Sequence, residues 1–239
     1  MVDLAAVFAR LEGAYGPQHW WPAETRFEVI VGALLMAQTS WSKVTEAIAN
    51  LKRAGVLTPQ TLAAMPIPRL RAMIRPAGLY RTKPRRLRGF CQHLVQVADG
   101  DLDRFFARDF GALRRELLSL DGVGPETADS ILLYAGRFPT FVVDAYTVRF
   151  GRRMGWFPYD RYDSIKAFFE TRLRPDRDRY GEFHALIVAH GKRTCRARPL
   201  CARCPVNAAC AFYAGNEDKR SGRGKIGDQA KRRHRFYIE

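Results

Sequence analysis

The sequence has no long apolar run and no recognisable secretion signal. No stretch approaches the roughly 18 apolar residues that a membrane-spanning helix requires. The first residues, Met1-Val2-Asp3-Leu4, lack the basic and then apolar order of a signal peptide. We therefore expect a cytoplasmic protein without membrane association.

Cysteine is scarce outside one short segment near the C-terminus. Of the five cysteines, Cys91 stands alone, and the other four are Cys195, Cys201, Cys204 and Cys210. A secreted disulfide scaffold would distribute its cysteines along a short chain, so this pattern indicates one local ligand set. Four thiolates in a short loop suit tetrahedral zinc or a [4Fe–4S] cluster. Four-cysteine zinc sites commonly use two Cys-x2-Cys pairs, and this segment has one such pair.

Acidic residues are in deficit. The chain has 40 Lys and Arg against 24 Asp and Glu, a formal net charge of +16. Residues 216–239 carry +4 of this charge, which leaves +12 on the rest of the chain. A basic body attracts a polyanion, because each neutralised phosphate releases a condensed counterion. The charge thus favours a nucleic-acid partner over a generally soluble cationic protein or a protein that binds an anionic membrane surface.

Strand signals are also scarce, whereas apolar residues recur with helical spacing. In residues 26–38, five apolar side chains follow the i, i+3, i+4, i+7, i+8 pattern of one helical face. Similar spacing predicts helices within residues 113–120, 128–135, 165–173 and 183–187. Gly and Pro residues separate these segments. The sequence therefore predicts an all-α protein with short connections.

Residues 120–128 join two of the predicted helices through a glycine-rich turn. Gly122 and Gly124 allow a sharp turn and the close approach of another backbone. Pro125 suits the first turn of the helix that follows, and Val123 is expected to anchor the turn in the core. The amides of such a turn point outward at a helix N-terminus, where a phosphate binds favourably. The alternative interpretation of residues 120–128 is a simple helix–helix turn without a binding role.

This run resembles the helix-hairpin-helix of the endonuclease III superfamily of DNA glycosylases. In that family an aspartate in a Val-Asp context follows about twenty residues later, and Val143-Asp144 has that spacing here. The segments 78–83, 37–39 and 190–191 are also similar to family segments, so the resemblance extends over residues 20–213. It implies double-stranded DNA containing a damaged base as the partner. We expect a monomer that is cytoplasmic and associated with the nucleoid.

The resemblance also implies a two-lobed helical fold with DNA and the active site between the lobes. We expect a helical barrel domain with the hairpin at residues 23–143. An iron–sulfur domain would combine residues 1–22 with residues 144–213. Residues 214–239 are rich in Gly, Lys and Arg and are expected to form a basic flexible tail.

For the cysteine segment, the resemblance favours a [4Fe–4S] cluster over zinc. The usual family spacing is Cys-x6-Cys-x2-Cys-x5-Cys, and the first gap here is one residue shorter. In the family the cluster is mainly structural and shapes a basic loop. The resemblance and the charge pattern together imply DNA contacts from these residues: Gln38, Gly122, Val123, Gly124, Thr127, Lys192, Arg193, Arg196 and Arg198.

Asp144 is the predicted catalytic residue. Cleavage of an N-glycosidic bond builds positive charge on the deoxyribose, and a carboxylate stabilises that charge and orients or deprotonates water. The structural alternative is a helix N-cap, and both roles are compatible. Gln38 is expected, by the resemblance, to fill the gap left by a flipped base; its alternative role is a polar helix end. His184 and His190 are given no chemical role, and His190-Gly191 is interpreted as a helix C-cap.

Strand-nicking members of the superfamily carry a lysine two positions after the second hairpin glycine. Glu126 occupies that position here, and a carboxylate cannot form a Schiff base. We therefore predict a monofunctional glycosylase that leaves an abasic site. Lys43 would have to replace the missing amine for strand nicking to occur.

The 3-methyladenine branch of the superfamily is the most similar branch. It shares a Trp-Trp-Pro run, here Trp20, Trp21 and Pro22, and an aromatic residue after the Gln segment, here Trp41. Electron-rich rings could hold a cationic alkylated purine, whereas the usual place of tryptophan is a core or an interface. The alternatives are an endonuclease III-like enzyme for oxidised pyrimidines or mispaired uracil or thymine, and an inactive DNA-binding protein.

Overall fold

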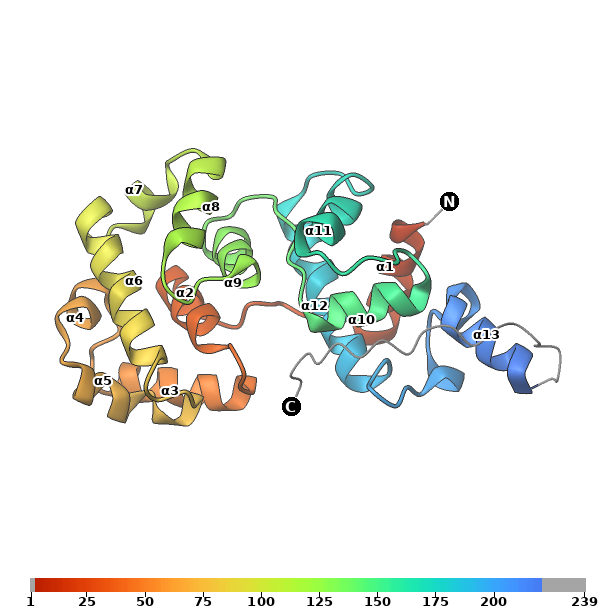
Figure 1. Ribbon diagram of the computed structural model, residues 1–239, viewed down its shortest axis with the longest axis horizontal. Coiled ribbons are helices and arrows are strands. Elements are labelled where there is room, and N and C mark those ends of the chain that lie inside the picture. The colour runs from red at the N-terminus through yellow and green to blue at the C-terminus, as the bar shows by residue number, and fades with distance from the viewer. Residues whose placement is uncertain (1–2, 221–239) are drawn as a thin grey trace. The chain divides into compact units, whose positions relative to one another are not determined.

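The computed structural model describes residues 3–220, with side chains to residue 216. This part of the chain forms helices and no strand, which confirms the predicted all-α fold (Figure 1). It divides into two compact units, one of residues 21–138 and one of residues 3–20 with 139–220. Among the described helices, none combines the length and the hydropathy that crossing a bilayer would require.

The unit of residues 21–138 is built around α2, nearly all of which is buried. Its helices are α2 (Arg26–Leu35), α3 (Trp41–Arg53), α4 (Pro59–Ala64), α5 (Ile67–Met73), the 3₁₀ helix η1 (Arg75–Ala77), α6 (Lys83–Ala98), α7 (Leu102–Phe106), α8 (Phe110–Ser119), α9 (Pro125–Ser130) and the π-helix η2 (Ile131–Ala135). Side-chain caps begin several of them, because Thr25, Thr58, Asp101 and Asp109 accept hydrogen bonds from first-turn amides. α4 packs along α6 (Figure 1).

The other unit has an aromatic core. Its helices are α1 (Leu4–Tyr15), α10 (Ala145–Met154), α11 (Tyr162–Glu170), α12 (Arg177–Arg193), the 3₁₀ helices η3 (Cys201–Arg203) and η4 (Asn207–Ala209), and α13 (Ala211–Arg220). Phe141 stacks on Phe169 with ring centroids 4.1 Å apart, and Phe183 packs edge-on against both. α12 contacts α1 and α10, so it is the central helix of this unit.

Two sequence predictions about helix ends are wrong. The helix predicted for residues 26–38 ends at Leu35, and Gln38 lies beyond it at φ +53°. Gly191 does not end a helix, because α12 continues to Arg193. A Cβ at Gly191 would lie 2.3 Å from Cδ1 of Tyr146, so the close approach of α10, and not a C-cap, requires this glycine.

The structure describes only the first part of the segment expected to form a basic flexible tail. Residues 214–220 belong to α13 and are helical. Residues 221–239, which make up the rest of the predicted basic tail, lie outside the described residues.

Candidate functional site

The predicted hairpin joins α8 to α9. α8 ends at Ser119, Gly124 is the N-cap of α9, and Pro125 occupies its first turn as predicted. Val123 is buried, which confirms the expectation that it anchors the turn in the core. The sequence motif thus folds as a turn with its apolar residue inward and its glycines at the surface.

The two hairpin glycines meet different requirements. Gly122 has φ +76°, and a Cβ there would lie 2.1 Å from Cδ and Nε of Arg86. The fold itself therefore requires glycine at position 122. Gly124 has φ −86°, and a Cβ there would meet no atom within 4 Å. The space beside Gly124 is open to the approach of another molecule.

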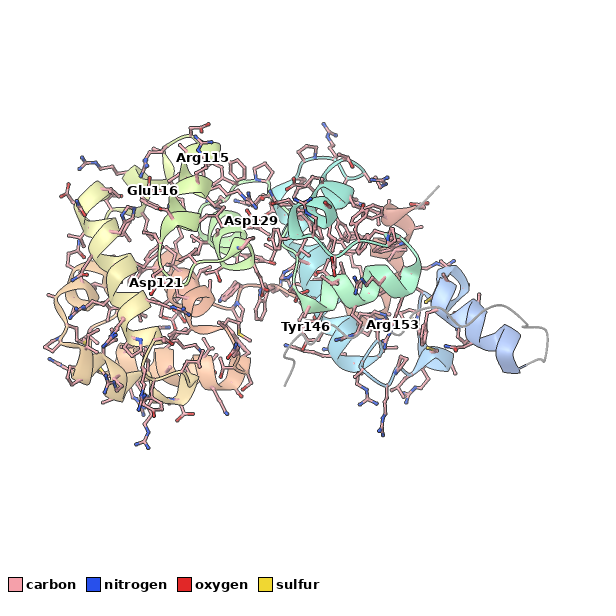
Figure 2. All side chains as sticks on the ribbon, viewed as in Figure 1. Arg115, Glu116, Asp121, Asp129, Tyr146 and Arg153 are labelled. Atoms are coloured by element: carbon pink, nitrogen blue, oxygen red, sulfur yellow. The ribbon has the colours of Figure 1, made fainter. Side chains whose placement is uncertain are left out.

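A buried ion pair holds the two hairpin helices together. Arg114 of α8 donates from its guanidinium to both carboxylate oxygens of Asp129 on α9, at 2.8 and 3.1 Å. The side chain of Asp129 has no exposed surface, so loss of Arg114 would remove a charge-assisted pairing from a fully buried carboxylate. At the turn, Asp121 lies 3.7 Å from Nε of Arg86 on α6. Figure 2 labels both carboxylates, with Asp121 beside α6 and Asp129 on α9.

Asp144 is placed at the N-terminus of α10. Its Oδ1 accepts hydrogen bonds from the amide of Thr147 at 2.7 Å and from Oγ1 of Thr147 at 2.9 Å. The N-cap role predicted for Asp144 is therefore confirmed. Its Oδ2 lies 3.6 Å from Nε2 of His184, and the Asp144 side chain is 11% exposed. One oxygen is thus committed to the helix, whereas the other faces an imidazole.

Opposing effects set the protonation of this carboxyl group. Burial raises the pKa of Asp144, but the interaction with His184 and the hydrogen bonds from Thr147 lower it further than burial raises it. The pKa lies below its usual value, so Asp144 is a carboxylate at neutral pH. A nearly buried carboxylate that stays ionised is suited to stabilising positive charge.

Sequence reasoning missed His184. This residue lies on α12, its side chain is 8% exposed, and it reaches Asp144 from a helix distant in the sequence. Its helical pattern marks only a buried face, so no local signal identifies the pairing. The other histidine of α12, His190, is fully buried and hydrogen-bonds through Nδ1 to the hydroxyl of Tyr15 at 2.8 Å.

The residues predicted to form a substrate pocket separate into two groups. The rings of Trp21 and Trp41 meet edge to face with centroids 5.3 Å apart, and Tyr134 lies 5.4 Å from Trp21. These three partly buried rings belong to the unit of residues 21–138. Trp20 lies in the other unit and lines an open cavity of about 190 Å³. Pro22 is exposed. The remaining lining residues of that cavity are Gln18, Ala185, Val188, Ala189, Lys192 and Arg193.

The four clustered cysteines line one small cavity of about 20 Å³. Cys195, Cys201, Cys204 and Cys210 all line it. Burial, reinforced by the three neighbouring cysteines, raises the pKa of Cys204 to about 11. Within the described part of the chain, no group of three or more His, Cys, Asp or Glu side chains is arranged to hold a single metal ion.

Basic side chains of α10 tie the cysteine loop to the helices. Arg149 donates to the carbonyl oxygens of Cys195 and Gly191 at 2.9 and 3.1 Å. Arg153 donates to the carbonyl of Arg196 at 2.6 Å and approaches Sγ of Cys195 at 3.3 Å (Figure 2). A guanidinium beside a sulfur atom suits a thiolate, so the donor set fits a group that binds thiolates. The predicted DNA-contacting residues of this region are exposed: Lys192, Arg193, Arg196 and Arg198.

Two strained surface turns belong to the same unit as the hairpin. The first turn contains Gln38, which is exposed and has φ +53°. Thr127, also predicted to contact DNA, is half-buried on α9 and belongs to neither turn. Leu79 has φ +43° and is 40% exposed, and Tyr80 beside it is 52% exposed. From the sequence, residues 78–83 are identified only as a segment similar to one in the family. A left-handed leucine with an exposed side chain is uncommon and indicates a functional constraint.

Comparison with known proteins identifies the family. Residues 31–175 match the family described as HhH-GPD superfamily base excision DNA repair protein. The chain belongs to the HhH-GPD superfamily. This membership makes the protein a DNA glycosylase of base excision repair, with DNA as its substrate, and confirms the resemblance to the endonuclease III superfamily.

Individual relatives cover most of the chain. The "Putative DNA repair glycosylase MJ1434" of Methanocaldococcus jannaschii is 46% identical over 199 residues, which are 82% of this chain and 90% of the relative. Endonuclease III of Sulfolobus acidocaldarius is 29% identical over 193 residues, 80% of this chain and 83% of the relative. The crystal structure of H. pylori 3-methyladenine DNA glycosylase (MagIII) bound to 1,N6-ethenoadenine has a TM-score of 0.72 and 26% identity. That similarity covers 80% of this chain and 98% of the other.

Proposed function

We propose that this glycosylase is monofunctional and excises alkylated purines, with Asp144 as the carboxylate that supports bond cleavage. The proposal rests on the combination of two features, one at Asp144 and one at Glu126. A nearly buried Asp144 is held ionised, while Glu126 stands where a Schiff-base lysine would stand in a strand-nicking relative. The first feature supports hydrolysis, and the second argues against lyase chemistry.

The proposed chemistry needs little acid catalysis. In an alkylated purine such as 3-methyladenine, the electron pair of the breaking N–C1′ bond neutralises the positive ring, so the base leaves uncharged. The deoxyribose becomes an oxocarbenium-like cation, which the carboxylate of Asp144 stabilises electrostatically. Water adds to C1′ and gives its proton to the carboxylate, so the product is an abasic site.

Aromatic side chains support the choice of an alkylated purine. Trp21, Trp41 and Tyr134 form a contiguous group of electron-rich rings, and a cationic base is attracted to such rings by stacking and cation–π interaction. Trp20 and Pro22 are the other residues predicted from the sequence to line the substrate pocket. The similarity to a 3-methyladenine DNA glycosylase with a modified adenine bound supports the same substrate class.

The residue at the hairpin position and the buried lysine of this unit offer no lyase nucleophile. Glu126 is exposed in the first turn of α9, where a carboxylate complements the helix N-terminus. Lys83 is buried, and its Nζ donates to the carbonyl of Ala77 at 2.6 Å. Burial and the charge of Arg86 lower the pKa of Lys83 to about 8, but its amine is enclosed. Lys43 is exposed on α3.

DNA binding is proposed to use the hairpin and the two strained turns. The open space at Gly124 admits a phosphate to the hairpin amides. Gln38 is proposed to fill the space of a flipped base, and Leu79 to enter the base stack, since exposed apolar side chains serve as wedges in DNA. The exposed cations of the cysteine region would contact phosphates.

We also propose that the four cysteines hold a [4Fe–4S] cluster. Their shared cavity and the guanidinium of Arg153 beside Cys195 fit a thiolate-bound cluster. Such a cluster would supply structural cross-linking of the loop between α12 and α13. Iron and acid-labile sulfide analysis of protein purified without oxygen tests this, with four iron atoms per chain expected; zinc or no metal would overturn it.

The decisive experiment compares duplexes that each carry one lesion. The set contains an alkylated purine, an oxidised pyrimidine, and uracil or thymine opposite guanine, each analysed with and without alkali. We expect excision of the alkylated purine, strand breakage only after alkali, and no covalent complex on borohydride reduction. Faster excision of another lesion would overturn the substrate class, and a trapped complex would overturn monofunctional chemistry. Absence of excision for every lesion would point to a DNA-binding protein without activity.

A further inference from the structure

A basic segment without acidic residues runs through the unit that carries the hairpin. Residues 47–98 contain ten Lys and Arg and no Asp or Glu. Eight of these ten lie within residues 69–88, which form most of α5, all of η1 and the first turns of α6. This stretch of 20 residues therefore carries a charge of +8, against +16 for the whole chain.

Four other arginines of this unit lie in ion pairs with carboxylates. Ion pairs of this kind involve Arg26, Arg104, Arg108 and Arg114. The arginines of residues 69–88 differ from them. Four are exposed and have no carboxylate within ion-pair distance among the described residues: Arg69, Arg75, Arg81 and Arg85. Like charges left uncompensated on a surface destabilise the free protein and favour binding of a polyanion.

The segment adjoins the hairpin on the same unit. Arg86, on the first turns of α6, covers Gly122 and lies 3.7 Å from Asp121 at the hairpin turn. Figure 2 shows Asp121 beside α6. A duplex held at the hairpin amides would therefore have the basic segment next to it.

The exposed apolar turn lies within the basic segment. Leu79 and Tyr80 follow Gly78, which has φ +74°, and precede Arg81, whose guanidinium lies 5.9 Å from the Tyr80 ring centroid. Apolar side chains that enter a base stack are flanked by backbone phosphates. Arginines on both sides of this turn in the sequence suit that environment.

We propose that the exposed arginines of residues 69–88 form a second phosphate-binding surface for duplex DNA, beside the hairpin. It holds the sugar-phosphate backbone without regard to base sequence. The proposal rests on the protein's action on duplex DNA, and it depends neither on which base is excised nor on the role of Asp144.

Charge-neutralising variants test the surface. The triple variant Arg69→Gln, Arg75→Gln, Arg85→Gln removes three exposed charges without a carboxylate partner. The matched control removes three exposed charges from the other unit: Arg10→Gln, Arg161→Gln and Arg174→Gln. The dissociation constant for an undamaged duplex is measured from about 50 to 200 mM salt, a range over which phosphate contacts dominate.

The salt dependence gives the result. Each lost phosphate contact lowers the slope of log K against log salt by about 0.9, so three contacts lower it by about 2.7. Raising the salt from about 50 to 200 mM should therefore weaken DNA binding about 40-fold less in the surface variant than in the wild type. The control variant should keep the wild-type slope. A change of less than one unit in the slope of log K against log salt, or an equal change of slope in the control, would overturn the proposal. Because the duplex is undamaged, failure of the proposed substrate specificity leaves this test unaffected.

Discussion

Replacing Asp144 separates its two roles, because asparagine and alanine preserve different parts of the structure. Asparagine retains a side-chain oxygen for the N-cap of α10 but carries no charge. Alanine removes both the charge and the hydrogen bonds from the amide and Oγ1 of Thr147. If Asp144 acts electrostatically, both variants should lose activity, but only Asp144→Ala should lose much stability.

The expected magnitudes follow from these contacts. Loss of an N-cap costs about 1 kcal/mol, and Thr147, which is fully buried, would leave a hydroxyl unpaired at a cost of about 1–3 kcal/mol. A total near 3 kcal/mol lowers Tm by roughly 6–12 °C for a chain of this size. For Asp144→Asn, Tm should change by less than about 3 °C. Loss of the charge should slow base excision about 10²–10³-fold, the typical effect of removing one preorganised electrostatic group.

Stability also depends on pH through the same carboxyl group. The folded-state pKa of Asp144 is below its unfolded value, so its contribution is present above the unfolded pKa and is lost as pH falls through the folded pKa. The stability difference between wild type and Asp144→Asn should therefore shrink below about pH 4.

Single-turnover excision and thermal unfolding, measured on wild type and both variants, test the reasoning. The substrate is the duplex from which the wild type excises the damaged base most rapidly. Excision by Asp144→Asn within tenfold of the wild-type rate would refute the electrostatic role. An equal loss of Tm in both variants would refute the separation of cap and charge.

Three further changes have defined outcomes. His184→Gln should slow excision with unchanged DNA affinity. It should also shift the acid limb of the pH–rate profile to higher pH, because the pKa of Asp144 rises without His184; an unchanged limb would count against the pairing. Gly122→Ala should destabilise the protein by about 1–2 kcal/mol because of its positive φ, whereas Gly124→Ala should keep Tm and weaken DNA binding; equal Tm losses would contradict this. Cys201→Ser should lower iron content and Tm together, and full iron retention would exclude it as a ligand.

The local sequence predicted the parts of the site that depend on near neighbours. The hairpin, the inward Val123 and the capping role of Asp144 each involve residues within a few positions of one another. Backbone geometry and short-range hydrogen bonds determine such features, so motif and spacing are sufficient to predict them. The exact end of α2 was less predictable, because the turn at Gln38 interrupts an apolar pattern that continues beyond Leu35.

The tertiary structure decided what depends on packing between distant segments. The sequence suggested that Gly191 ends a helix. In the structure Gly191 lies within α12, and Tyr146 of α10 packs against it. Trp20 and Trp21 are adjacent in sequence, yet one lines a cavity with Lys192 and Arg193 and the other packs against Trp41. A linear pattern contains no information on such contacts.

By itself, the sequence determined the helical class and the hairpin, and it identified the four cysteines proposed as ligands and Asp144 as the candidate carboxylate. Only the tertiary structure brought His184 from α12 to within 3.6 Å of that carboxylate. It also placed Arg86 over Gly122. The physical reason is that ionisation and close approach depend on which side chains share a volume, and that is fixed only when the helices pack.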